Sequence, residues 1–126
     1  MNLPSGVCRP IQGTNALIYY KLNTPQGLSI VKTKIYLQFK LPWFAATAQF
    51  SNFLFICGGA DRGTVYNHES LRTVHKFDLV REEPADILPG LMNARTGACL
   101  VAHSNSHLVV IGGCRDLLKN SMKSCE

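Results

Sequence analysis

The pattern of apolar positions in this chain predicts short β-strands. Two apolar runs, residues 53–57 and 107–111, are rich in β-branched and aromatic residues, and each ends at a Gly-Gly pair. Such runs are typical of buried strands that stop where the backbone must take an unusual turn. The pairs Gly58-Gly59 and Gly112-Gly113 lie 54 residues apart. The chain therefore contains an internal repeat.

Further strands are predicted around each of these runs. The apolar segments 44–50 and 97–103 precede them across short polar turns, which predicts two hairpins. Residues 72–80 alternate between apolar and polar and predict a third strand, whereas residues 85–94 are interrupted by Pro and Gly and suit only an edge-like fourth strand. One period of the repeat thus holds four strands and no helix of useful length.

The N-terminal part has a looser β pattern. Residues 16–22 and 31–40 are strand candidates separated by a turn at residues 23–27. In the second candidate, apolar residues occupy one face, and lysines lie on the other face, where they protect a sheet against edge-to-edge aggregation. These two strands are interpreted as the third and fourth of a preceding, degenerate repeat.

The order of the marked positions resembles the kelch repeat, a unit of about 50 residues that forms one four-stranded blade of a β-propeller. The matching positions, in chain order, are Gly58-Gly59, Phe77-Asp78, Leu88-Pro89, Ala94-Arg95 and Gly112-Gly113. The Trp that this pattern places about three residues before Leu88 is missing, and Trp43 lies where the pattern requires none. The resemblance implies an all-β fold of about two four-stranded antiparallel blades, an incomplete β-propeller.

This resemblance divides the chain into three parts. Residues 1–43 are a divergent segment that could be the end of a degenerate blade, residues 44–95 form a kelch repeat, and residues 96–126 begin a second, truncated repeat. Propellers have at least four blades, so the chain is expected to be a piece of a longer protein, a truncated product or a module completed by other copies or partners. Its end at Glu126, before any third strand, favours truncation.

Charge argues against a nucleic-acid partner, and the lack of targeting signals bears on the cellular compartment. The net charge is +5, and residues 1–60 contain five basic and no acidic residues, but these cations are single and lie between apolar residues. This suits a solvated strand face rather than a nucleic-acid surface. No signal peptide or membrane-spanning stretch is found, and five cysteines without C-x-x-C spacing favour a reducing, cytoplasmic setting.

The sequence predicts no catalytic residue, cofactor or metal, and hence no enzyme. His103 and His107 bracket a turn but lack a third ligand, and no nucleophile or phosphate-loop signature occurs. Asp78 and Arg95 occupy kelch positions and are expected to make structural hydrogen bonds. Cys57 and Cys99 are expected to be small buried hydrophobes, and Cys114 or Cys125 is the candidate for a redox-sensing thiol.

Kelch proteins bind partners through blade loops, and the longest predicted loop here is 60–71. Its candidate contact residues are Asp61, Arg62, Tyr66, Asn67, His68 and Glu69. The sequence thus predicts a protein-protein interaction module, a scaffold or adaptor, whose partner is another protein. Two alternatives stay open: a fragment of a kelch-like propeller enzyme, and a truncated product with no independent function.

Overall fold

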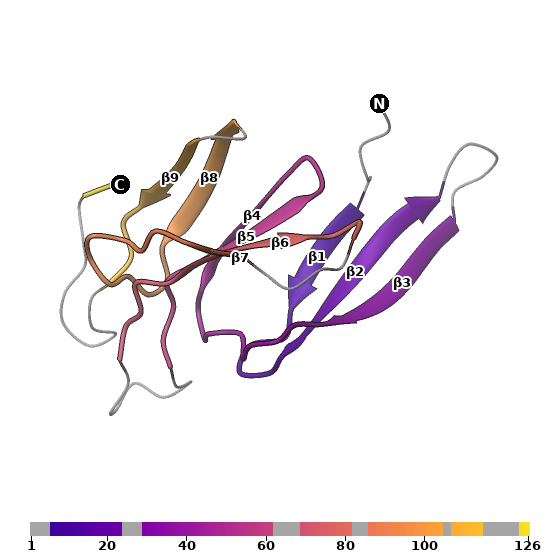
Figure 1. Ribbon diagram of the computed structural model, residues 1–126, viewed down its shortest axis with the longest axis horizontal. Helices are drawn as coiled ribbons and strands as arrows, with labels where there is room; N and C mark the ends of the chain where they lie inside the picture. The colour runs from indigo at the N-terminus through magenta and orange to yellow at the C-terminus, as the bar shows by residue number, and fades with distance from the viewer. Residues whose placement is uncertain (1–5, 24–28, 62–68, 82–85, 105–106, 115–123) are drawn as a thin grey trace.

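The computed structural model describes residues 6–23, 29–61, 69–81, 86–104, 107–114 and 124–126, and these residues form nine β-strands and no helix. The strands make three antiparallel sheets of three, four and two strands. Figure 1 shows the sheets following one another along the molecule, with the four-stranded sheet in the middle. The all-β fold predicted from the sequence is confirmed, as an incomplete propeller-like arrangement.

The first sheet holds three strands in the order β1 (Gly6–Pro10), β2 (Ala16–Asn23) and β3 (Ser29–Tyr36). The two predicted N-terminal strands are present as β2 and β3, although β3 ends earlier than the alternating pattern suggests. Beyond it the backbone bonds to the β1–β2 connection, with Leu37 N donating to Asn15 O at 2.7 Å. Strand β1 was missed, because five residues containing both Gly and Pro carry no alternating pattern.

The central sheet contains β4 (Ala46–Phe50), β5 (Phe53–Cys57), β6 (Val74–Asp78) and β7 (Asp86–Leu88), paired in that order. These are the four strands predicted for one repeat. The β4–β5 hairpin turns through Ser51 and Asn52, and Ser51 has a positive φ of 57°. The fourth strand is only three residues long, as its Pro and Gly neighbours predict.

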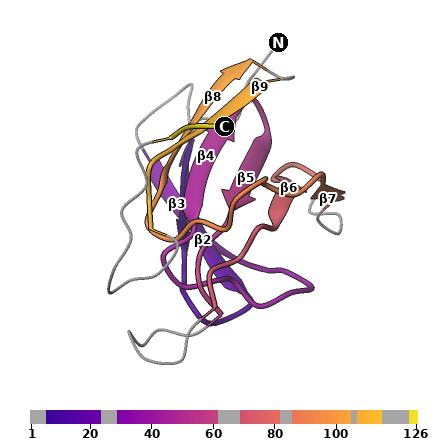
Figure 2. The same cartoon turned by 90° about the vertical axis from the view of Figure 1, so that its left-hand side faces the viewer.

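The third sheet consists of β8 (Cys99–Ser104) and β9 (His107–Ile111), and Figure 2 views the molecule from the end that carries it. Residues 124–126 lie beside β9: the backbones of Val110 and Glu126 exchange two hydrogen bonds of 2.8 and 2.9 Å, and Ile111 bridges Cys125. Cys57 and Val74 pair in the same way in the central sheet.

The last three residues therefore occupy the place of a third strand in the second repeat. This pairing is a single bridge rather than a full strand, and it was not predicted from the sequence. A pairing of three residues is too short to produce an alternating pattern in the sequence.

Two hydrophobic layers hold the sheets together. The first lies between the first and central sheets and comprises Leu17, Tyr19, Ile35, Leu37, Leu41, Leu54, Ile56, Phe77 and Leu79. The second lies between the central and third sheets and comprises Ala46, Cys57, Val74, Leu91 and Val110, with Leu88, Ala98, Leu100 and Leu108 packed against it. The central sheet is covered on both faces, which explains why β5 is a continuous apolar run.

Both Gly-Gly pairs adopt the same left-handed backbone. The φ angles are 63° and 98° at Gly58 and Gly59, and 68° and 86° at Gly112 and Gly113. A Cβ atom at Gly58 would clash with the carbonyl oxygen of Arg95. Glycine is required here by both its positive φ and this close backbone approach.

Candidate functional site

The predicted partner-binding loop connects β5 to β6 and is closed at its neck by hydrogen bonds. Asp61 N donates to Glu69 O at 3.1 Å, and Glu69 N donates to Asp61 Oδ1 at 2.6 Å. Ala60 forms bridges with both Ser70 and Trp43. Both acidic side chains are exposed. The other predicted contact residues, Arg62, Tyr66, Asn67 and His68, lie outside the described residues.

The neck is anchored to a buried hydroxyl network that the sequence analysis did not find. The hydroxyls of Ser70 and Thr96 lie 2.8 Å apart, and Thr96 Oγ1 donates to Gly59 O at 3.1 Å. Thr96 is fully buried, at 0% exposed. This network ties the loop to the Gly-Gly turn and to the segment that enters β8. Thr96 is 26 residues from Ser70 and 37 residues from Gly59 in the sequence, so no local sequence pattern reveals the network.

Arg95 is the largest side chain among those that the described structure buries completely, at 1% exposed. Its Nε donates to Glu126 Oε2 at 2.9 Å and its Nη1 donates to Gly112 O and Ser124 O, both at 2.8 Å. Its own carbonyl oxygen accepts a bond from Gly59 N at 2.7 Å. Arg95 thus connects both Gly-Gly turns to the last residues of the chain. The arrangement is that of a structural cation.

The Glu126 carboxylate accepts three hydrogen bonds at this junction. The donors are Arg95 Nε and the backbone N–H groups of Met92 and Asn93. Partial burial alone would raise the pKa of this carboxyl, but the bonds from Met92, Arg95 and Asn93 outweigh burial and lower it. The ionised form is therefore the one that the structure holds.

Phe77 and Asp78, the aromatic-acid pair of the repeat, lie at the end of β6. Phe77 is 1% exposed and belongs to the first hydrophobic layer. The Asp78 carboxylate accepts bonds from Asn52 Nδ2 at 3.0 Å and from the backbone N–H groups of Val80 and Arg81 at 2.9 and 3.0 Å. Desolvation opposes ionisation, yet these bonds lower the pKa of Asp78. The acid caps the turn that follows the strand.

The Leu88-Pro89 pair lies at the outer edge of the central sheet. Leu88 packs against the second hydrophobic layer, whereas Pro89 is exposed. The turn after it is held by Arg72, whose Nε donates to Leu91 O at 2.7 Å and whose backbone oxygen accepts a bond from Leu91 N. The backbone N–H groups of Met92 and Asn93, which follow this turn, bond to Glu126 at the junction around Arg95.

The two histidines of the β8–β9 hairpin are neighbours. The ring centroids of His103 and His107 lie 6.5 Å apart with an interplanar angle of 74°. Within the described part of the chain, no group of three or more His, Cys, Asp and Glu side chains is placed to hold a metal ion. The pair is an edge-to-face ring contact.

The cysteines differ in burial, and all five are free thiols. Cys57 is buried, and desolvation, followed by the charge of Glu126, raises its pKa to about 11. Cys99, expected to be buried, is exposed, because its neighbour Leu100 faces the core and successive residues of a strand point to opposite faces. Cys125 is also exposed, and Cys114 is half-buried.

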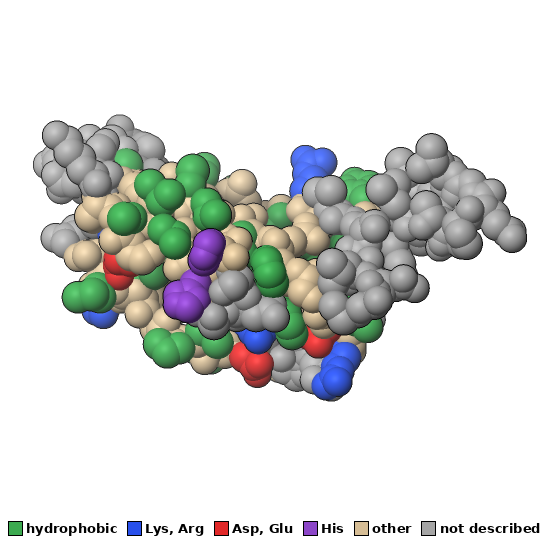
Figure 3. Space-filling view, turned by 90° about the horizontal axis from the view of Figure 1, so that it is seen from above, with side chains coloured by type: hydrophobic (Ala, Val, Ile, Leu, Met, Phe, Trp, Pro, Cys, Tyr) green, Lys and Arg blue, Asp and Glu red, His purple; other side chains and the backbone are tan. Residues whose placement is uncertain are grey.

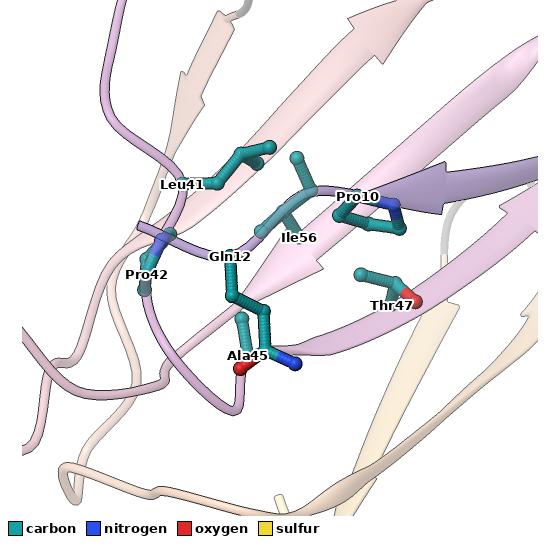
Figure 4. Close-up of a pocket in the computed structure, with 7 residues that line it drawn as sticks. All are labelled: Pro10, Gln12, Leu41, Pro42, Ala45, Thr47 and Ile56. Atoms are coloured by element: carbon teal, nitrogen blue, oxygen red, sulfur yellow. The ribbon is translucent and has the colours of Figure 1, made fainter. Parts of the chain in front are cut away.

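A small pocket of about 190 Å³ lies between β1, β4 and the segment that joins β3 to β4 (Figure 4). It is lined by Pro10, Gln12, Leu41, Pro42, Ala45, Thr47 and Ile56. Gln12 and Thr47 alone among these residues are polar, and Gln12 Oε1 accepts a bond from Phe44 N at 2.9 Å. Pockets for small ligands usually measure roughly 300–1,000 Å³. This lining has no nucleophile and no acid-base pair.

Two buried polar atoms in the described structure have no hydrogen-bond partner, Tyr19 Oη and His75 Nδ1. Tyr19 belongs to the first hydrophobic layer. His75 stacks on Phe39, which packs against that layer, and the two ring centroids lie 3.9 Å apart. Burial lowers the pKa of His75, and burial together with the neighbouring Cys8 raises the pKa of Tyr19. Both are therefore held neutral near pH 7.

Comparison with known proteins gives a likeness of fold. The sequence matches no protein-family model and no curated protein. Among solved structures, that of YjhT matches with a TM-score of 0.61 and 19% sequence identity, over 92% of this chain and 35% of YjhT. The chain thus spans about a third of that protein's length.

None of the described elements is a helix with the length and apolarity needed to cross a membrane.

Proposed function

We propose that this chain is a kelch-type protein-protein interaction module that acts as a scaffold or adaptor and binds its partner through the 60–71 loop. The observation that carries the proposal is the neck of this loop. Paired backbone bonds close it at Asp61 and Glu69, and Thr96 ties it to the sheet junction. Binding residues are commonly found on loops that a rigid scaffold positions.

The kelch assignment is supported by what the residues at the pattern positions do. Both Gly-Gly pairs turn through positive φ, and Phe77 fills the core between two sheets. Asp78 caps the following turn, and Arg95 joins one repeat to the next. Each position has a physical reason for its residue type.

The composition of the loop favours a protein partner. Arg62, Tyr66 and His68 lie between the two acidic residues of the neck. Tyr and Arg are enriched among residues that dominate binding energy at protein interfaces. A partner surface that offers both an apolar pocket and acidic groups fits this set.

The test replaces Arg62, Tyr66 and His68 together by Ala and measures captured proteins by quantitative mass spectrometry. Loss of such anchor residues costs roughly 2 kcal/mol or more each, so partner capture should fall at least tenfold. The matched control replaces Tyr36 and Lys40, an exposed aromatic residue and an exposed cation of the N-terminal part, and should keep full capture. Undiminished capture by a correctly folded loop variant would place binding elsewhere.

A further inference from the structure

One face of the third sheet is mostly apolar and is not covered by any other described strand; His107, which alternates with Val109 and Ile111, lies at its hairpin end. This face is formed by Cys99, Val101, Val109, Ile111 and Cys125, here called the open face. Cys99 pairs with Ile111, Val101 pairs with Val109, and Ile111 bridges Cys125. Side chains directly opposite one another in antiparallel strands share a face. None of the five is charged, and Val101 and Ile111 are each 50% exposed.

The view from above shows hydrophobic side chains gathered over the end of the molecule that carries β8 and β9 (Figure 3). The opposite face of the same sheet contributes Leu100, Leu108 and Val110 to the second hydrophobic layer. The third sheet is therefore apolar on both faces. Sheets of this kind are normally buried on both sides.

The internal repeat shows what such a face is used for. In the central sheet, Ala46 pairs with Cys57, Ala48 pairs with Phe55, and Cys57 pairs with Val74. These are the counterparts of the three pairs that form the open face. In the central sheet the counterpart surface is covered, since Ala46, Cys57 and Val74 pack under the third sheet. The same surface thus occurs twice in one chain, once covered by another sheet and once bare.

The outer face of the first sheet of a second copy is poorly suited to pack on the open face. Its middle row consists of Arg9, Ile18 and Lys34, which the strand register places side by side. Both cations are exposed. Packed on the open face they would meet valine, isoleucine and cysteine, and an unpaired buried charge is strongly unfavourable.

We propose that the open faces of two copies of this chain pack against each other about a two-fold axis. The contact brings apolar side chains onto apolar side chains, and the open face contains no Lys, Arg, Asp or Glu side chain. It is isologous, the commonest type of contact in homo-oligomers. The two sheets lie face to face, about 10 Å apart, as in other β-sandwiches. The open face contains none of residues 60–71, so this proposal stands or falls apart from the proposed function.

The thiols report directly on this contact. Cys99 and Cys125 lie on either side of Ile111, two strand spacings or about 10 Å apart. That is beyond the reach of a disulfide within one chain. When two copies are paired, the open face of the second copy covers both Cys99 and Cys125. Each thiol then lies against the same set of side chains that surrounds it in its own chain.

The first experiment measures the mass of the reduced full chain by size-exclusion chromatography with light scattering. We expect the mass of two chains, and alkylation of Cys99 and Cys125 slowed at least tenfold at high relative to low protein concentration. Val101→Lys should give the mass of one chain with an unchanged β-sheet circular dichroism spectrum. Ile87→Lys, at a 77% exposed site on β7, is the matched control and should leave two chains together.

The second experiment tests the symmetry. In Cys125→Ser, a flexible bis-maleimide should join Cys99 of one copy to Cys99 of the other, as mapped by mass spectrometry, because only a patch that meets itself places one residue beside its own copy. Three results would overturn the proposal: a single-chain mass at all concentrations with rapid Cys99 alkylation, a dimer that Tyr36→Lys dissociates and Val101→Lys does not, or aggregates that Val101→Lys and Ile87→Lys affect alike.

Discussion

At the scale of single residues, the buried polar groups fall into two kinds. The Arg95 guanidinium is fully buried, and its bonds reach Gly112, Ser124 and Glu126. The imidazole of His75 is also buried, but its Nδ1 has no partner. The Arg95 guanidinium depends on its hydrogen-bond acceptors, and the His75 imidazole is held in its neutral form. Loss of an acceptor therefore affects the first, and protonation of the ring affects the second.

Glu126→Gln should be destabilising, because it leaves the buried Arg95 cation without its counter-charge. Breaking a buried ion pair by removing one partner costs about 3–5 kcal/mol, and we expect about 2–3 kcal/mol here, since Glu126 is 16% exposed. Urea unfolding measures this as a lower midpoint with an unchanged slope. Glu69→Gln, at an exposed site, should shift stability by less than about 0.5 kcal/mol.

The same carboxyl gives a signature in acid. Because the folded-state pKa of Glu126 is lowered, its stabilisation is complete above the ordinary carboxyl pKa and is lost as pH falls through the lowered value. Glu126→Gln should therefore lose less stability than the wild type on acidification below about pH 4.5. Parallel pH profiles for the two proteins would contradict the ion-pair assignment.

His75 predicts a second pH effect, in a higher range. Its folded-state pKa lies below the ordinary value of 6.5, so above that pH the imidazole is neutral in both folded and unfolded chains. As pH falls below 6.5, the unfolded chain takes up a proton that the buried ring resists, and the free energy of unfolding decreases. His75→Phe, which retains an aromatic ring against Phe39, should flatten this profile between pH 7 and 5. The exposed His103→Gln should not.

At the scale of elements, the Gly-Gly turns are the positions where backbone geometry dictates the sequence. Gly58 and Gly97 both have positive φ angles, of 63° and 69°. A Cβ atom at Gly58 would meet the Arg95 carbonyl oxygen, whereas one at Gly97 would meet no atom within 4 Å. A substitution at Gly97 therefore tests the strain of the positive φ alone, and one at Gly58 tests that strain together with the clash.

Gly97→Ala should therefore cost about 1–2 kcal/mol of stability, from the left-handed backbone alone. Gly58→Ala adds a backbone collision and should cost at least about 2 kcal/mol more, because Arg95 is fixed by its own hydrogen bonds. Urea unfolding of the two variants gives the comparison. Equal losses at the two sites would show that the Gly58 turn can move away from Arg95.

The elements also show what the sequence could predict and what it could not. Strands β5 and β9 and their glycine turns were predicted, because apolar runs and Gly-Gly pairs are local signals. The β1 strand and the pairing of residues 124–126 with β9 were not, since each is too short for periodicity. The expected burial of Cys99 failed because the pattern gives alternation within β8 but not which face is covered.

At the scale of the whole molecule, long-range contacts set the limit of prediction. The four strands of one repeat follow from the sequence pattern, but the hydroxyl pair of Ser70 and Thr96 and the ion pair of Arg95 and Glu126 join residues 26 and 31 positions apart. Asp61 and Glu69 were predicted as contact residues from loop position alone, and their hydrogen-bonded neck emerged only in three dimensions.

The buried guanidinium also bears on how the chain unfolds. In repeat proteins, stability is approximately the sum of the intrinsic stabilities of the repeats and the coupling between nearest neighbours. Arg95 belongs to the first repeat, yet its acceptors Gly112, Ser124 and Glu126 all belong to the second. If the second repeat unfolded alone, Arg95 would lose these three acceptors while its side chain remained attached to the folded first repeat. Partial unfolding is thereby disfavoured, and we expect the two repeats to melt as one cooperative unit.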